Sequence, residues 1–138
     1  MTRIKFDIDT MKIMSLFETI TRAKLKDCII SEGMITFIVE ENEAAKAIGK
    51  KGANVKTLER GLKKKIKIVE FSTDLIRFVQ NLAYPAKIRE ANQEGKILTL
   101  TAVDSQSRGL LIGRGASILR NYESIVKRYF DIDEIKVD

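Results

Sequence analysis

The feature that most constrains the fold is an internal repeat, because the same order of helix and strand patterns occurs twice within the 138 residues. Each copy reads as helix, strand, strand, helix, helix, strand. At an offset of 64 residues the central parts of the copies align without a gap, from Val39 on Val103 to Leu62 on Val126. Apolar residues and glycines keep their places along this alignment. The chain is therefore predicted to fold as two tandem α+β units.

The first copy begins with apolar residues at helical spacing and continues with two β-branched runs. Asp9 or Thr10 is expected to cap its first helix. We place the first domain at residues 1–72. Its predicted elements are a helix over 10–25, strands over 26–31 and 34–40 joined at Glu32 and Gly33, two helices that meet at a glycine corner and end near 64, and a strand over 66–71.

The second copy restarts the order at residue 73 with almost no linker, and we place the second domain at residues 73–138. The single proline, Pro85, follows its first helix and cannot continue it. Each domain is predicted to pack a three-stranded mixed sheet against its helices. The predicted elements are a helix over 74–83, strands over 86–91 and 96–103 around a turn at 92–95, helices over 106–112 and 117–130 around a second corner, and a strand over 134–137.

The first corner, residues 49–52, reads Gly-Lys-Lys-Gly. Glycines three apart can adopt backbone angles that a Cβ forbids, so the chain can turn sharply there. Lys50 and Lys51 lie at the apex, and the following helix offers its unsatisfied N–H groups and positive dipole end to the same place. The first corner is therefore expected to bind an anion such as a phosphodiester.

Gly-Lys-Lys-Gly matches the GXXG signature of the KH module, a loop that clamps about four nucleotides. The order of elements resembles the prokaryotic, type II, form of this module. Two such modules in direct succession resemble the KH pair of the NusA family of transcription factors in its short archaeal form, and residues 81–88 resemble the connection into its second KH domain. The resemblance covers nearly the whole chain. It implies a non-catalytic protein that binds nascent single-stranded RNA during transcription elongation and termination.

The resemblance assigns RNA binding to both corners, although the second, residues 113–116, ends in Ala116 instead of glycine. If that position needs a positive φ, alanine strains it by roughly 1 to 2 kcal/mol; the alternative is that Gly115 provides the bend. The resemblance places the bases in a groove beside each corner, with apolar walls at Ile48, Val55 and Ile68 in the first unit and at Ile112, Leu119 and Ile135 in the second. The implied RNA-binding residues are Ile48, Gly49, Lys50, Lys51, Gly52, Val55, Lys56 and Ile68, with Ile112, Gly113, Arg114, Gly115, Leu119 and Arg120 in the second unit.

Composition narrows the function further. With no histidine and the single cysteine Cys28, the usual zinc sites, His-based triads and an internal disulfide are excluded, so we expect no metal and no cofactor. Aromatic residues make up 7% of the chain and Trp is absent, which disfavours base recognition by ring stacking. The formal charge of +6 suits an anionic partner, and residues 1–71 carry net +5 of it, from 15 Lys and Arg against 10 Asp and Glu.

Several plainer interpretations stay open. Lys63, Lys64 and Lys65 are interpreted as a solvated helix end, and Cys28 as a buried thiol.

No apolar run reaches the roughly 20 residues of a membrane span, and the amino terminus lacks a signal peptide's apolar core, so we expect a cytoplasmic protein and no membrane partner. RNA polymerase or the elongation complex is a further expected partner, and a monomer is favoured. The alternative function is a ribosome-assembly or translation-associated KH protein.

Overall fold

The computed structural model describes residues 8–31 and 33–138. Residues 1–7 and Glu32, part of the predicted first hairpin, lie outside the described residues. The described residues divide into two compact units, 8–72 and 73–138.

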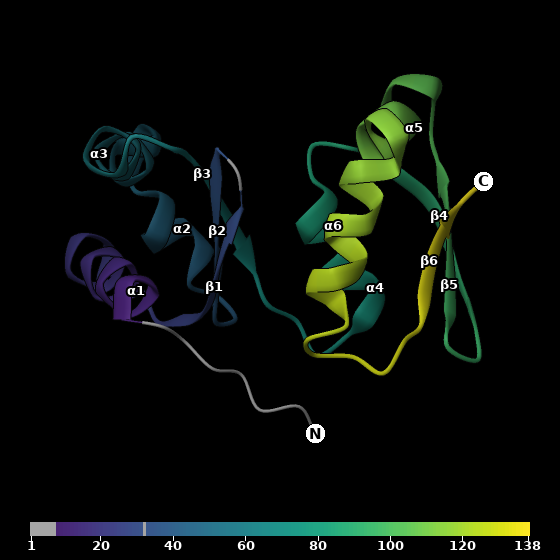
Figure 1. Cartoon of the computed structure of the whole chain (residues 1–138), viewed down its shortest axis with the longest axis horizontal. Coiled ribbons are helices and arrows are strands. Elements are labelled where there is room, and N and C mark those ends of the chain that lie inside the picture. The colour runs from purple at the N-terminus through teal and green to yellow at the C-terminus, as the bar shows by residue number, and fades with distance from the viewer. Residues whose placement is uncertain (1–7, 32) are drawn as a thin grey trace. The chain divides into compact units, whose positions relative to one another are not determined.

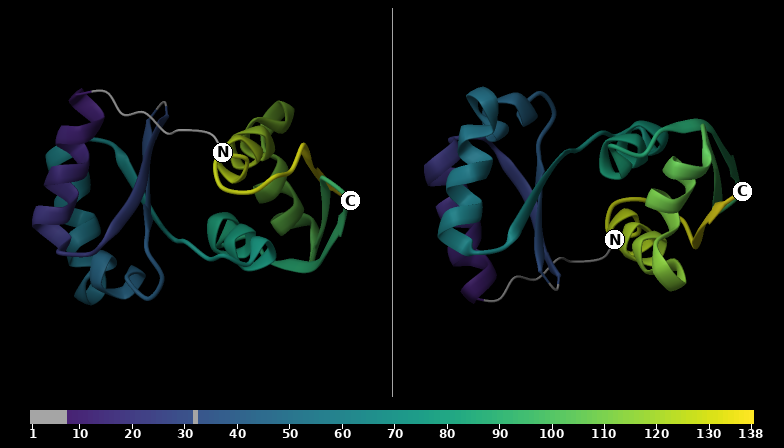
Figure 2. Two further views of the ribbon diagram at one scale, coloured as in Figure 1. Left: turned by 90° about the horizontal axis from the view of Figure 1, so that it is seen from below. Right: turned by 90° about the horizontal axis from the view of Figure 1, so that it is seen from above.

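In the first unit the helices lie on one face of a three-stranded sheet (Figures 1 and 2). The sheet has the order β1-β2-β3, with β1 antiparallel and β3 parallel to β2. The elements are α1 (Ile8–Thr21), β1 (Leu25–Ser31), β2 (Met34–Val39), α2 (Ala44–Ile48), the 3-10 turn η1 (Lys50–Gly52), α3 (Ala53–Leu62) and β3 (Lys65–Glu70).

The second unit repeats this arrangement, with its helices on one face of the sheet β4-β5-β6 (Figure 1). The strand β4 is antiparallel and β6 parallel to β5. The elements are α4 (Leu75–Ala83), β4 (Ile88–Glu94), β5 (Ile97–Ala102), α5 (Ser105–Ile112), the 3-10 turn η2 (Arg114–Ala116), α6 (Ser117–Val126) and β6 (Glu134–Val137). The predicted α+β class and the two mixed sheets packed against helices are confirmed.

The first helix ends earlier than predicted. It stops at Thr21 rather than near residue 25, because Arg22 adopts a left-handed conformation with φ of 59°. The Thr21 hydroxyl accepts the N–H of Ala23 at 3.1 Å, which holds the chain outside the helix. The described part of α1 already includes Ile8, so neither Asp9 nor Thr10 is the cap that was predicted. Asp9 instead lies in the first turn, where an acidic side chain interacts favourably with the helix dipole.

Two elements of the second unit also differ from prediction. The helix α6 ends at Val126 instead of residue 130, because the next turn tightens: the N–H of Tyr129 bonds the carbonyl of Val126 at 3.1 Å. The second hairpin is longer than expected, since β4 continues to Glu94 and Gly95 takes a φ of 59° in a short turn.

The repeat offset varies along the chain. Cys28 pairs with Phe37 in the first sheet and Ala91 with Leu100 in the second, an offset of 63 in both strands. The residue of the second sheet equivalent to Val39 is therefore Ala102, and the predicted alignment of Val39 with Val103 is wrong by one residue.

The last strands are offset by more than the corners. Met34 pairs with Lys65 in the first unit, and Ile97 pairs with Glu134 in the second, so β3 and β6 are 69 residues apart. Extra residues between α6 and β6 account for the difference. The counterpart of Ile135 is therefore Ile66, and that of Ile68 is Val137.

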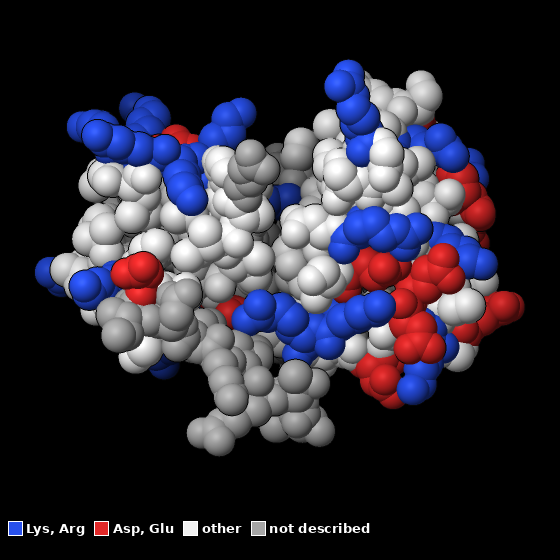
Figure 3. All heavy atoms as spheres, viewed as in Figure 1, with Lys and Arg blue, Asp and Glu red and all other residues white. Residues whose placement is uncertain are grey.

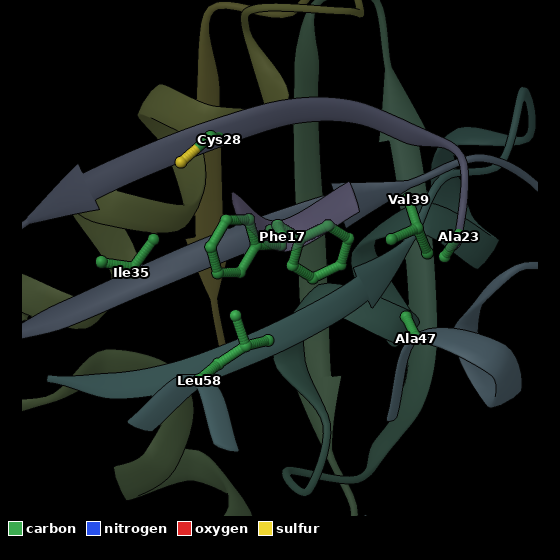
Figure 4. Packing of buried hydrophobic residues seen from close by; sticks show 8 residues of the cluster. Phe17, Ala23, Cys28, Ile35, Val39, Ala47 and Leu58 are labelled. Carbon is green, nitrogen blue, oxygen red and sulfur yellow. The ribbon is translucent and has the colours of Figure 1, made fainter. Parts of the chain in front are cut away.

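The core of the first unit lies between its helices and sheet (Figure 4). The rings of Phe17 on α1 and Phe37 on β2 stack with centroids 4.2 Å apart. Cys28 is 4% exposed and unbridged, which confirms the predicted buried thiol. In the second unit Phe78 takes the aromatic role, with its ring 5.6 Å from that of Tyr129. Among the described helices, none has the length and apolar composition needed to cross a bilayer.

Candidate functional site

The first corner joins α2 to α3 through a sharp backbone turn. Gly49 ends α2 with φ of 80° and ψ of 166°, a conformation open in practice only to glycine. Lys51 and Gly52 then take consecutive left-handed conformations, with φ of 55° and 72°. The N–H of Gly52 bonds the carbonyl of Gly49 at 3.0 Å and closes the turn. A left-handed lysine costs about 1 to 2 kcal/mol, so the rest of the fold must offset the strain at Lys51.

The two glycines of the first corner are required for different reasons. A Cβ on Gly49 would lie 2.9 Å from Cγ and 3.0 Å from the backbone nitrogen of Asn54, so no side chain fits there. A Cβ on Gly52 would meet nothing within 4 Å. Gly49 therefore allows a close approach as well as an unusual φ, whereas Gly52 serves only the backbone angle.

The helix α3 begins without a side-chain cap. Its N-cap is Gly52, which has no side chain to accept the first N–H groups. In contrast, α4 and α5 are capped by Asp74 and Asp104, whose carboxylates accept from Ile76 at 3.3 Å and Ser107 at 2.7 Å. The N–H of Ala53 bonds the carbonyl of Lys50, but no side chain caps the N–H groups that follow, so these donors and the positive dipole end remain at the corner. An anion can satisfy these donors.

Three cations surround this helix start. Lys50, Lys51 and Lys56 are exposed, and within the described part of the chain none of them forms an ion pair. Lys46 is different, since its Nζ lies 3.6 Å from a carboxylate oxygen of Glu43. Lys and Arg side chains gather over the α3 side of the first unit (Figure 3). The first corner therefore combines ammonium groups outside any ion pair with N–H donors that no side chain caps.

The predicted apolar neighbours of the first corner lie at graded depth. Ile48 is 38% exposed, a large value for isoleucine, and lies directly before Gly49. Val55 is half-buried in the first turn of α3. Ile68 is half-buried on β3 and packs against the core cluster. Ile48 and Val55 are thus adjacent to the corner in the chain, while Ile68 is mainly a core residue.

The second corner joins α5 to α6 with nearly the same backbone. Gly113 has φ of 71° and ψ of 177°, and Gly115 and Ala116 follow with φ of 61° and 62°. Both alternatives for this corner therefore hold: Gly115 bends the chain, and Ala116 also takes the positive φ that strains it. A Cβ on Gly113 would lie 2.6 Å from the Ile118 side chain, so this glycine too allows a close approach.

The second corner carries less free positive charge. Arg114 is exposed at its apex, but the Arg120 guanidinium lies 2.9 Å from a carboxylate oxygen of Glu123. Ile112 is half-buried, whereas Leu119 and Ile135 are 6% and 0% exposed. Leu119 and Ile135 are therefore core side chains and do not form an exposed wall.

Two kinds of side-chain hydrogen bond that support the corners, each made in both units, were not predicted from the sequence. Glu59 on α3 accepts the N–H of Ile66 at 3.2 Å, and Glu123 on α6 accepts that of Ile135 at 2.8 Å. Each of these bonds fixes the helix after a corner to the last strand of its unit. Glu59 and Glu123 are 64 residues apart, so the corner alignment contained the signal.

The second kind of hydrogen bond fixes the helix before each corner to the start of the unit's first strand. Glu43 accepts the N–H of Lys24 at 2.7 Å, and the hydroxyl of Ser107 accepts the N–H of Lys87 at 3.0 Å. The hydrogen bond from the Lys24 backbone lowers the pKa of Glu43 below its ordinary value, and the nearby charge of Lys46 acts in the same direction. The equivalent backbone N–H is thus held by a carboxylate in the first unit and by a hydroxyl in the second.

No group of three or more His, Cys, Asp and Glu side chains in residues 8–31 and 33–138 is arranged to hold a metal ion. The acidic residues near the corners instead hold backbone N–H groups and cations.

Comparison with known proteins identifies similar sequences over almost the whole chain. The profile of a family described as KH domain matches residues 12–80. A Methanococcus vannielii protein named probable transcription termination protein NusA is 30% identical over 98% of this chain and 80% of its own length. A Thermoplasma acidophilum protein of the same name is 29% identical over 99% of this chain and 97% of its own.

A solved structure is also similar. The crystal structure of the protein APE1850 superposes with a TM-score of 0.76 and 27% sequence identity, covering 96% of this chain and 100% of the other.

Proposed function

This chain belongs to the KH-domain family, and on that premise we propose that it binds single-stranded RNA at the first corner without catalysing a reaction. The single observation that carries the proposal is the uncapped start of α3 beside two free lysines, Lys50 and Lys51. A phosphodiester accepts from such N–H groups and is attracted by the ammonium charges. This is the chemistry of a loop that clamps a nucleic-acid backbone.

In the proposed complex the phosphates occupy the corner and the bases lie beside it. The exposed Ile48 and the half-buried Val55 provide apolar contact for the bases, and Lys56 extends the positive charge along α3. Base edges then select by hydrogen bonding, as in other single-strand readers. The role of Gly49 is to let the backbone turn tightly under the phosphate.

We further propose that both units are type II KH domains in tandem, at residues 1–72 and 73–138. The shared strand pairing and the shared angles at the two corners support this division. The second corner is proposed as a weaker RNA contact, because Arg120 is held by Glu123. Arg114 is then its main cation.

At the level of the cell, we propose a role in transcription elongation and termination, on the basis of the name that the similar archaeal proteins carry. Affinity purification of the full chain from its native cells tests this role. RNA polymerase subunits in the purified fraction would support it. Ribosomal subunits in their place would favour the ribosome-assembly alternative.

The binding step is tested by measuring the affinity for a short single-stranded RNA at several salt concentrations. About four phosphate contacts on a single strand give a slope near −3 in log affinity against log salt. The same strand annealed to its complement serves as a control and should bind more weakly. A flat salt response, or equal binding of both forms, would contradict the proposal.

A further inference from the structure

Asn54, the second residue of α3, connects the two helices across the first corner. Its side-chain Nδ2 donates to the backbone carbonyl of Lys46 on α2 at 3.0 Å. A carbonyl oxygen can only accept, so this bond fixes which end of the amide faces α2. The start of α3 is thereby tied to the end of α2 by a bond independent of the turn itself.

The carbonyl of Lys46 needs this bond. It belongs to the last turn of α2, where carbonyl oxygens have no partner within the helix, and Gly49 turns the chain away before another residue can supply one. An unpaired carbonyl carries negative partial charge beside a corner proposed to hold a phosphate. The Asn54 amide satisfies that oxygen and offsets its charge.

Asn54 also fills the space beneath Gly49. The position of a Cβ on Gly49 is 2.9 Å from Asn54 Cγ and 3.0 Å from Asn54 Nδ2, so the amide lies directly against the glycine. The side chain thus limits both the position of α2 and the path of the loop. A loop held in its binding conformation loses less entropy when a ligand arrives.

The second unit lacks this amide. Its equivalent residue is Ile118, whose side chain lies under Gly113 and fills the same space with hydrocarbon. Isoleucine can support the glycine by packing but cannot donate to a carbonyl. The comparison separates two roles that Asn54 combines: filling the space beneath the glycine and bonding the preceding helix.

We propose that Asn54 is the positioning residue of the first corner, which keeps residues 49–52 preformed for the RNA backbone by bonding the Lys46 carbonyl. This inference rests on the proposed RNA binding. Asn54 acts through the corner and is not itself assigned a contact with RNA. The second corner, with Ile118, lacks this device.

The test compares Asn54→Ala and Asn54→Ile with the wild-type full chain. The expected result is a loss of affinity for single-stranded RNA of about tenfold in both variants, since one hydrogen bond that orders the corner is lost. The slope of log affinity against log salt should become shallower by about 0.7 for each phosphate contact that the relaxed corner gives up. A purely structural role would lower the folded fraction and leave that slope unchanged.

Asn121→Ala is the matched control, because Asn121 is an exposed asparagine on α6. It should leave affinity and slope unchanged. As a second readout, the amide chemical shifts of residues 49–52 in the RNA-free protein should change in Asn54→Ala, while those of residues 113–116 stay in place. Asn54→Ile keeps the space filled and so guards against a variant that fails to fold.

The outcomes separate the two proposals. A wild-type protein that binds no single-stranded RNA overturns the proposed function. A wild-type protein that binds, together with Asn54 variants of equal affinity, equal slope and unchanged loop shifts, overturns only the role of Asn54.

Discussion

In the first corner the two consecutive left-handed residues are Lys51 and Gly52, and in the second they are Gly115 and Ala116. In each corner, one of the two left-handed positions is therefore a glycine and the other holds a residue with a Cβ in a strained conformation. In the first corner that residue is a lysine at the apex, and in the second it is an uncharged alanine. The comparison shows that the bend does not depend on a complete Gly-x-x-Gly pattern, so the order of glycines alone says little about binding.

The difference between the corners lies in their charge. Lys56 is exposed without an ion pair among the described residues, whereas its counterpart Arg120 contacts Glu123 at 2.9 Å. Two lysines occupy the first apex and one arginine the second. Both corners thus offer an anionic backbone the same bend, but only the first corner carries several cations outside ion pairs among the described residues. Substitutions in the two units test this comparison, from the charges at the apices to the backbone angles of the corners and the hydrogen bonds that precede them.

Charge reversal at the two apices should give unequal losses. We expect the double variant Lys50→Asp with Lys51→Asp to lose about 100-fold in affinity for single-stranded RNA, because two charged contacts become repulsive. Arg114→Asp should lose less than about fivefold. Fluorescence anisotropy with a labelled RNA at fixed salt measures both. Equal losses would show that the second corner binds as strongly as the first.

The glycines that begin the corners should tolerate alanine less well than Gly52. Gly49→Ala should lower the free energy of unfolding by roughly 2 kcal/mol or more, because the new Cβ meets Asn54 and the backbone angles suit only glycine. Gly52→Ala should cost about 1 kcal/mol, because only its φ is strained. Urea unfolding of the two variants gives the comparison. A Gly52→Ala loss as large as that of Gly49→Ala would contradict this account of the bend.

The strain at Ala116 should be removable. Ala116→Gly should raise the free energy of unfolding by about 0.5 to 1 kcal/mol, since the relief of a left-handed alanine exceeds the added flexibility of glycine in the unfolded chain. Urea unfolding, with Gly109→Ala as a control at a helical position, checks it. A loss of stability in Ala116→Gly would mean that the positive φ at this position is not strained.

The smallest effect concerns the hydrogen bonds that Glu43 and Ser107 accept before the corners. The pKa of Glu43 is lowered in the folded protein, so its stabilising contribution is present above the ordinary pKa of 4.5 and is lost as pH falls through the folded value. The stability difference between the wild type and Glu43→Gln should therefore shrink in acid. Ser107 makes the equivalent bond without titrating, so the penalty of Ser107→Ala should not change over that range.

Thermal unfolding between pH 3 and pH 7 compares the two penalties. The prediction fails if the Glu43→Gln penalty stays constant over the acid range. It also fails if the Ser107→Ala penalty changes as much as the Glu43→Gln penalty does.

The sequence predicted the class, the element order and the corners well, because periodicity and glycine spacing are local signals. It predicted helix ends less well. Arg22 at positive φ and the tightened turn after Val126 depend on how the chain packs onto its sheet, which no local pattern contains. The extra residues before β6 change the offset of the last strand, which the ungapped alignment of the corners did not contain.

At the candidate site, sequence reasoning found the exposed cations of the first corner but not the residues that support the corner. Lys50 and Lys51 are recognisable from charge beside glycine. Asn54, Glu43 and Glu59 act through bonds to backbone groups 7 to 19 residues away, and such bonds depend on the tertiary fold. Conversely, Leu119 was predicted at an open wall and lies in the core, because an apolar residue after a glycine corner reads the same in both settings.

The central claim is that the first corner, residues 49–52, holds the backbone of single-stranded RNA. Mapping amide chemical-shift changes of the full chain during titration with a short single-stranded RNA tests it most directly. The account predicts the largest changes over residues 49–55, including the first N–H groups of α3, with smaller changes over residues 113–119. Changes confined to the second corner, or saturable binding that leaves residues 49–55 unperturbed, would contradict it.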